Sequence, residues 1–103
     1  MYKLSYFVPE SHLETVKVAV FKAGAGKTGD YEHCCWETKG QGQFKPLVGS
    51  SPYIGDQNQT TKLTEWKVEV VCNSENIRAA VQALKSTHPY EQVAYDVIKL
   101  EAL

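Results

Sequence analysis

Apolar and polar residues alternate along three stretches of the chain, which is the pattern expected of half-buried β-strands. The pattern is clearest around Trp66, Val68 and Val70, which would share one face of a strand while charged residues occupy the other. Each stretch is also rich in the β-branched and aromatic residues that favour extended backbone. The three predicted strands are residues 2–8, 64–72 and 93–100.

A first amphipathic helix is predicted for residues 12–23, where apolar residues recur at helical spacing. Ser11 and Glu14 match a capping box, in which a hydroxyl and a carboxylate satisfy free amide groups of the first turn. Gly24 follows the last apolar position and can adopt the left-handed backbone that ends many helices. We therefore expect Gly24 to close this helix rather than to open the next element.

A second helix should begin after Asn73 or Ser74, whose short polar side chains are typical helix caps. It should end by Thr87, because Pro89 disfavours helical backbone at the residue before it. The apolar residues that would form its inner stripe are Ile77, Ala80, Val81 and Leu84.

The segment between these framework elements contains all seven glycines and two of the three cysteines. Its start, residues 31–38, reads as a fourth strand. Gly40 and Gly42 are then expected to bend the chain, and a long loop region should occupy about residues 37–63. Long loops in small domains are commonly functional, so we expect the chemistry of the protein in this segment.

The predicted order is strand, helix, strand, strand, helix, strand. Two strand–helix–strand halves of similar length indicate the ferredoxin-like α+β fold, with a four-stranded antiparallel sheet and both helices on one face. The crossover connections should be right-handed. At this length the chain is expected to be a single domain over residues 1–103.

Composition and charge narrow the classes of function. The formal net charge is −1, so there is no excess of basic residues to neutralise phosphates, and nucleic-acid binding is not expected. No run of about 18 apolar residues and no signal-peptide pattern is seen, which makes a cytoplasmic protein without membrane contact the default expectation. The number of cysteines is odd and Cys34 adjoins Cys35, which favours reduced thiols.

Two phosphate-binding patterns occur around Lys27. Residues 24–29 satisfy GxGxxG, and residues 26–28 mimic the end of a P-loop. Both patterns require a strand before the glycines and a helix after them, whereas here a helix precedes and a strand follows. A structural turn is therefore expected, although consecutive amides together with Lys27 could form a nest that binds an anion.

Five short motifs follow one another along the chain: Ala23-Gly24-Ala25-Gly26, Gly29-x-Tyr31-x-x-Cys34, Gly40-x-Gly42-x-Phe44-x-Pro46, Pro52-x-Ile54-Gly55 and His88-Pro89-Tyr90-Glu91-x-x-Ala94-Tyr95-Asp96. With them the chain resembles, from about residue 4 to residue 100, a stand-alone form of the CutA/PII-like domain inserted in Nif-three-like proteins of the YqfO type. The resemblance implies a ferredoxin-like domain similar to the PII signalling and CutA proteins, which form trimers. The two-metal centre of the larger proteins lies in flanking domains, so their hydrolase or cyclohydrolase activity is not implied here.

Metal binding or thiol chemistry is one class of function for the central segment. On the predicted strand only His33 with Cys35, or Glu32 with Cys34, could share a face, and thiolate with imidazole suits a divalent transition metal such as zinc, or copper(I). Two ligands are too few for a closed site, so cysteines that simply pack in the core are the favoured outcome. The enzyme hypothesis is a thiol- or metal-dependent hydrolase using Cys34 or Cys35 with His33; a protein without catalytic activity is favoured over it.

The motif at residues 88–91 is the other candidate site. His88 would lie at the C-terminus of the second helix, which favours the charged form of its ring. The main hypothesis is a small homotrimeric module, regulatory in role, that binds a small molecule or a metal ion; a trimer would also cover exposed sheet edges. A protein-interaction domain is the remaining alternative. The candidate ligand-binding residues are Lys27, His33, Cys34, Cys35, His88, Tyr90 and Glu91, with His33 and Cys35 as metal ligands.

Overall fold

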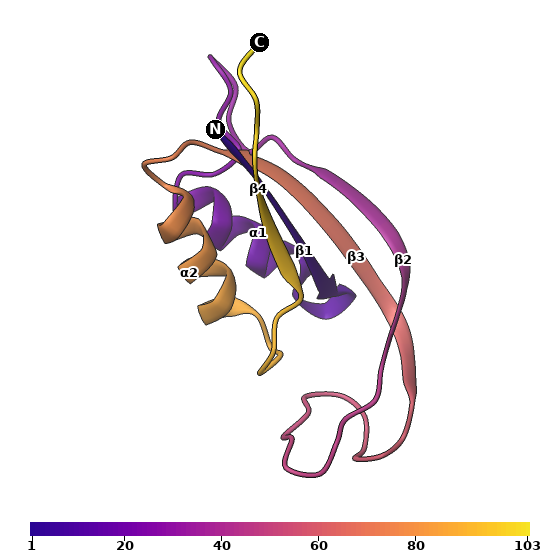
Figure 1. Cartoon of the computed structure of the whole chain (residues 1–103). Helices are drawn as coiled ribbons and strands as arrows, with labels where there is room; N and C mark the ends of the chain where they lie inside the picture. The colour runs from indigo at the N-terminus through magenta and orange to yellow at the C-terminus, as the bar shows by residue number, and fades with distance from the viewer.

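A computed structural model describes the whole chain, residues 1–103. It contains four strands and two helices in the order β1, α1, β2, β3, α2, β4, with a short 3₁₀ turn, η1, before α1 (Figure 1). This is the order that the sequence predicts. The bounds are β1 Tyr2–Pro9, η1 Glu10–His12, α1 Leu13–Lys22, β2 Trp36–Phe44, β3 Thr61–Cys72, α2 Ile77–Thr87 and β4 Tyr95–Lys99.

The four strands form one antiparallel sheet in the order β2-β3-β1-β4. Each strand–helix–strand half therefore leaves room for a strand of the other half between its own two strands, as the ferredoxin-like fold requires. Both helices cover the same face of the sheet, and the opposite face is open (Figure 1). The predicted α+β ferredoxin-like fold is confirmed.

The hydrophobic core lies between the two helices and the covered face of the sheet. Leu4, Tyr6 and Val8 alternate along β1 and are fully buried, and Val68 and Val70 of β3 lie beside them. Burying a side chain of this size contributes roughly 1.5–3 kcal/mol, so this layer is the main source of stability. The core residues are Leu4, Tyr6, Val8, Leu13, Val16, Val20, Ala25, Val68, Val70, Cys72, Ile77, Ala80 and Leu84.

The chain before β2 is not the strand that the sequence predicts over residues 31–38. β2 begins only at Trp36, and the residues before it form turns and irregular backbone. His33 has a φ of 59°, in the left-handed region, which interrupts any extended run at that point. The alternation of side chains assigned to residues 31–35 is therefore wrong.

The expected bend at residues 40–42 is also wrong, because Gly40 and Gly42 lie inside β2. Gly42 pairs with Leu63 across the hairpin, and the long partner strand β3 keeps this glycine-containing stretch extended. The loop region predicted over residues 37–63 accordingly contracts to residues 45–60, between the two strands.

The β2–β3 hairpin reaches beyond the rest of the sheet. β1 pairs only with the part of β3 from Glu65 onward, so residues 61–64 pair with residues 41–44 of β2 alone. We call residues 41–64 the arm and residues 45–60 the arm loop. Figure 1 shows the arm extending away from the helices, and the molecule is elongated, at 46 × 25 × 24 Å.

The helix ends agree only in part with the caps that the sequence predicts. Gly24 has a φ of 110° and follows α1, as predicted. The capping box does not form, because the Ser11 hydroxyl lies 2.8 Å from Nδ1 of His12 and no side chain caps the helix. Asn73 Oδ1 accepts a hydrogen bond from the Asn76 amide at 2.9 Å, which stabilises the turn before α2 rather than the helix itself.

α2 ends at Thr87, as predicted, whereas β4 is shorter than the predicted residues 93–100. The backbone before β4 nevertheless continues the ladder, since the Phe7 amide donates to the Ala94 carbonyl oxygen at 3.1 Å. Neither helix has the length and apolar character that a membrane-spanning segment needs.

Candidate functional site

The glycine-rich turn after α1 is a structural joint. The Gly24 amide bonds back to α1, and the Gly26 amide donates to the Val71 carbonyl oxygen of β3 at 2.8 Å. The Gly26 carbonyl oxygen in turn accepts a bond from the Cys34 amide at 2.8 Å. These amides are therefore not free for an anion-binding nest. Lys27 is exposed beside the turn, and an anion site there stays a prediction.

His33, Cys34 and Cys35 lie in the irregular segment before β2. The His33 ring stacks on Phe21, with 5.0 Å between the ring centroids and 15° between the planes. The Cys34 thiol donates to the Glu32 carbonyl oxygen at 3.7 Å, whereas Cys35 packs against the core. Burial raises the pKa of the Cys35 thiol. The shared strand face expected for His33 and Cys35 is wrong, because neither residue belongs to a strand.

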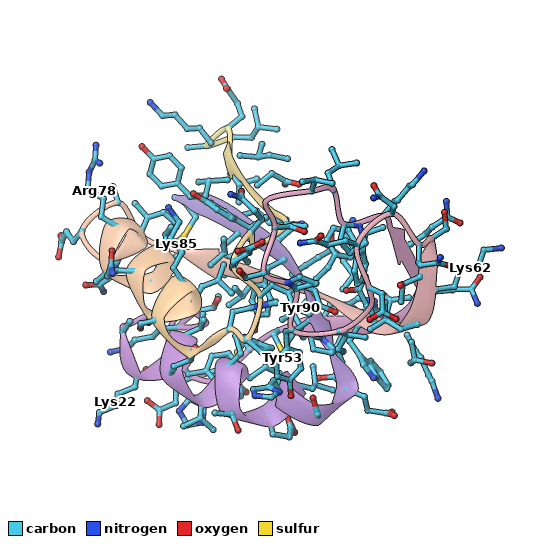
Figure 2. The ribbon with its side chains drawn as sticks, turned by 90° about the horizontal axis from the view of Figure 1, so that it is seen from below. Lys22, Tyr53, Lys62, Arg78, Lys85 and Tyr90 are labelled. Carbon is cyan, nitrogen blue, oxygen red and sulfur yellow. The ribbon has the colours of Figure 1, made fainter.

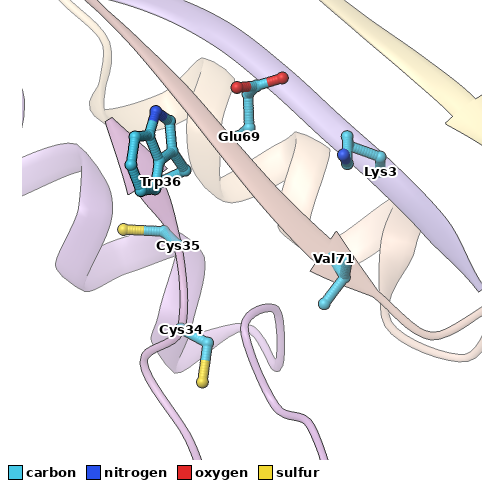
Figure 3. A pocket seen from close by; sticks show the side chains of 6 residues that line it. All are labelled: Lys3, Cys34, Cys35, Trp36, Glu69 and Val71. Atoms are coloured by element: carbon cyan, nitrogen blue, oxygen red, sulfur yellow. The ribbon is translucent and has the colours of Figure 1, made fainter. Parts of the chain in front are cut away.

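Cys34 and Cys35 line an open recess of about 490 Å³ together with Trp36 (Figure 3). The two thiols point in different directions in this view. Nowhere in the chain do three or more His, Cys, Asp or Glu side chains come together as a metal ion would need. The residues present do not fit a closed metal centre, and a metal held by His33 and Cys35 would need ligands from a second chain.

His88 is buried and fixes the corner between α2 and β4. Its Nε2 lies 2.7 Å from the Phe7 carbonyl oxygen, and its Nδ1 lies 3.1 Å from the Tyr90 amide nitrogen. Because the Tyr90 amide donates to Nδ1, the ring must donate through Nε2, which is the neutral form. Burial lowers the pKa of His88, although the bond to Phe7 acts in the other direction. The charged form expected from the helix terminus is therefore wrong: desolvation outweighs the helix dipole.

Tyr90 and Glu91 tie this corner to the arm. The Tyr90 hydroxyl donates to Glu65 Oε2 at 3.0 Å, and the Ser51 amide donates to Glu91 Oε1 at 2.9 Å. Burial raises the pKa of the Tyr90 hydroxyl, and the bond to Glu65 adds to the effect. Two of the predicted ligand-binding residues thus contact partners that are 25 and 40 positions away in the sequence.

Aromatic rings reinforce the same contact. The rings of Phe44 and Tyr53 lie 6.1 and 6.4 Å from the ring of Tyr90, measured between centroids. Tyr53 also meets the His12 ring edge-on at 5.6 Å, so the arm loop folds back onto η1. Figure 2, which views the molecule from below, shows Tyr53 and Tyr90 beside each other.

A cleft of about 410 Å³ opens between the arm and the corner after α2, and we call it the arm cleft. Of the predicted site residues, only Tyr90 and Glu91 line it, while His88 supports the corner. The four other candidates, Lys27, His33, Cys34 and Cys35, do not line it.

Three residues that line the arm cleft, Phe44, Tyr53 and Glu65, were not among the predicted ligand-binding residues. In the sequence Phe44 precedes Pro46 by two residues and Tyr53 directly follows Pro52, and this pairing of aromatic residues with prolines was the available signal. Glu65 gave no signal, because it reads as one of several charged residues along β3.

No model of a known protein family matches the chain. The chain is similar to the GTP cyclohydrolase 1 type 2 homologues of Mycobacterium leprae, at 43% identity over 94 residues, and of Bacillus subtilis, at 39% identity over 99 residues. These matches cover 91% and 96% of this chain but only 24% and 26% of the relatives. The chain thus spans about a quarter of the length of the curated relatives that it matches.

Among solved structures, the Bacillus cereus protein related to NIF3 matches with a TM-score of 0.83 and 36% identity, over 98% of this chain and 26% of that one. The chain is a relative of the domain carried inside NIF3-related proteins. CutA of Archaeoglobus fulgidus, a periplasmic divalent cation tolerance protein, matches this NIF3-related domain with a TM-score of 0.69 and 15% identity, over 99% of this chain and 86% of its own. At that identity the match to CutA shows the fold alone.

Proposed function

We propose that the NIF3-related domain is a small ligand-binding module and that the arm cleft is its site. The observation that carries this proposal is the meeting of three separate segments at one concave surface: the arm loop, β3 at Glu65, and the corner at Tyr90 and Glu91. An apolar cleft with a few fixed polar groups is the usual form of a small-molecule site.

The two walls of the arm cleft differ in how firmly they are held. The corner is fixed, because both ring nitrogens of His88 are bonded to backbone groups. The arm loop touches the corner through one hydrogen bond to Glu91 and through the ring of Tyr53. A ligand that contacts both walls would add to these few contacts and order the loop, which gives the module a means of regulating a partner.

We also propose that the domain assembles as a homotrimer. β2 is an edge strand with one side unpaired, and such edges favour pairing with another chain. The open face of the sheet exposes Trp36 and Ile98, at 69% and 55%, which assembly would cover. Light scattering after size-exclusion chromatography measures the mass directly, and a monomer at working concentration would contradict this proposal. Trp36→Ser should weaken the trimer, whereas Tyr31→Ser, at an exposed residue outside the sheet, should not.

Metal binding at His33 and Cys35, and hydrolysis that uses these residues, have less support. The raised pKa of Cys35 is the opposite of what an activated thiolate needs, and His33 stacks on Phe21 rather than bonding to a thiol. Elemental analysis of the purified protein tests the metal hypothesis. Zinc or copper at stoichiometric level that disappears in Cys35→Ser would restore it.

A thermal-shift screen with nucleotides, amines and divalent ions tests the proposed site. A ligand present at about 100 times its Kd stabilises the folded chain by about 2.7 kcal/mol. For a chain of this size that corresponds to a rise in Tm on the order of 10 °C. Tyr53→Ala should remove the shift, and Tyr31→Ala is the matched control outside the arm cleft. A shift that survives Tyr53→Ala would place the ligand elsewhere.

A further inference from the structure

Three aromatic side chains, Phe44, Tyr53 and Tyr90, line the arm cleft. The planes of Phe44 and Tyr53 are tilted by 56° and 46° to that of Tyr90, so the three rings do not form a flat stack. All three rings line the same cleft, and the face of each ring carries negative charge density. Such faces attract cations, and sites built from several of them recognise substituted ammonium groups.

The carboxylates of the arm cleft are not neutralised by the rest of the chain. Glu65 and Glu91 line the cleft, and neither belongs to an ion pair; the ion pairs of the chain involve Lys17 and Lys67. Each carboxylate uses one oxygen to accept a bond from a neutral donor. Lys45 also lines the cleft, so two carboxylates stand against one ammonium and the cleft carries a net charge of −1.

Gly42 leaves room for the Glu65 carboxylate because it has no side chain. A Cβ at position 42 would overlap the carboxylate of Glu65, which therefore lies directly on the backbone of β2. Glycine inside a strand commonly marks the close approach of another group. The Tyr90 hydroxyl fixes the same carboxylate from the other side. The negative charge is thus positioned before any ligand arrives, which reduces the cost of ordering it on binding.

We propose that the arm cleft binds a small organic cation, an amine or quaternary ammonium compound with an apolar body. This inference rests on the proposed function of the cleft and names the ligand class. The cationic group would contact the rings of Tyr53 and Tyr90 and face the carboxylate of Glu65, while the apolar body lies along the prolines of the arm loop.

The charge of the cleft argues against the other ligand classes. An anion would bring its charge toward two carboxylates and could pair only with Lys45, which is exposed. A neutral apolar ligand would remove water from the carboxylates without replacing it, and that desolvation is unfavourable. A cation would be attracted both by the aromatic rings and by the carboxylates.

The test compares choline with 3,3-dimethylbutan-1-ol, which has the same shape without the charge. Backbone amide chemical shifts of the ¹⁵N-labelled chain follow each titration. We expect choline to shift Tyr53 and Tyr90 and to bind about tenfold more tightly than its neutral isostere, as expected for a cation–aromatic contact beside a carboxylate. Gly42→Ala, which displaces the Glu65 carboxylate, and Glu65→Gln should both weaken choline about tenfold while leaving the neutral compound unchanged. Glu75→Gln, an exposed acid outside the cleft, is the control.

Four results would overturn this inference. Two results would refute a cationic ligand and leave the proposed site standing, provided that Tyr53 and Tyr90 shift. One is equal binding of choline and its neutral isostere. The other is binding of adenosine monophosphate, added as an anionic test compound, more tightly than choline. Unchanged choline affinity in Glu65→Gln would refute the role of the carboxylate. Shifts confined to residues outside the arm cleft would refute both the ligand class and the proposed site.

Discussion

Replacing Gly26 by alanine tests whether the glycine-rich turn is a structural joint. Gly26 has a φ of 81°, and a non-glycine residue in left-handed backbone costs roughly 1–2 kcal/mol. A Cβ at this position would lie 2.9 Å from the Cys34 carbonyl oxygen and 2.9 Å from the Phe21 ring. Relieving that overlap should weaken a backbone hydrogen bond of Gly26, to Val71 or to Cys34, at a cost of about 1 kcal/mol. We therefore expect Gly26→Ala to lower the free energy of unfolding by about 2–3 kcal/mol.

Urea unfolding followed by circular dichroism measures this change. Gly29→Ala is the matched control, because Gly29 has a φ of 56° but nothing within 4 Å of its Cβ position. Gly29→Ala should lose only the cost of placing a non-glycine residue in left-handed backbone, about 1–2 kcal/mol. If Gly26→Ala is as stable as Gly29→Ala, the turn is not held by the contacts described, and an anion site at Lys27 becomes the better explanation of the glycines.

Three further changes can be predicted. Acidification should destabilise the fold, because folding lowers the pKa of His88 and the unfolded chain therefore binds more protons below about pH 6.5. In His88→Gln, the midpoint of urea unfolding should fall less between about pH 7 and pH 5 than in the unchanged chain. Lys17→Met should destabilise by about 1 kcal/mol, since Lys17 Nζ lies 2.6 Å from Glu37 Oε1, and a double-mutant cycle with Glu37→Gln should show coupling between the two. Brief alkylation near neutral pH should leave Cys35 and Cys72 largely unmodified, because burial raises the pKa of these two thiols. Cys34 should be alkylated first, and mass spectrometry of the labelled peptides gives the order in which the cysteines react.

The framework was predictable because its signals are local. Alternation places Leu4 and Tyr6 on the buried face of β1, and helical spacing places Ile77 and Leu84 on the buried side of α2. Gly24 ends α1 because its own backbone preference agrees with the fold. In each case the residues of one element carry enough information to specify that element.

The central segment was not predictable in this way, because its structure depends on distant partners. The second half of β2 contains Gly40 and Gly42 and has little burial, so it has little strand signal of its own. Pairing with β3 keeps it extended. The neutral form of His88 depends on burial under the corner that it fixes. The bond from Tyr90 to Glu65 joins residues whose neighbourhood only the folded chain creates.

The arm lies outside the hydrophobic core that stabilises the fold. None of the core residues lies between positions 41 and 64, and the outer end of the hairpin has no sheet neighbour except its own partner strand. Opening or replacing that end should therefore cost little of the global stability. If the arm cleft binds a ligand as proposed, natural variation or design can alter the loop for a different ligand while the sheet and helices stay the same.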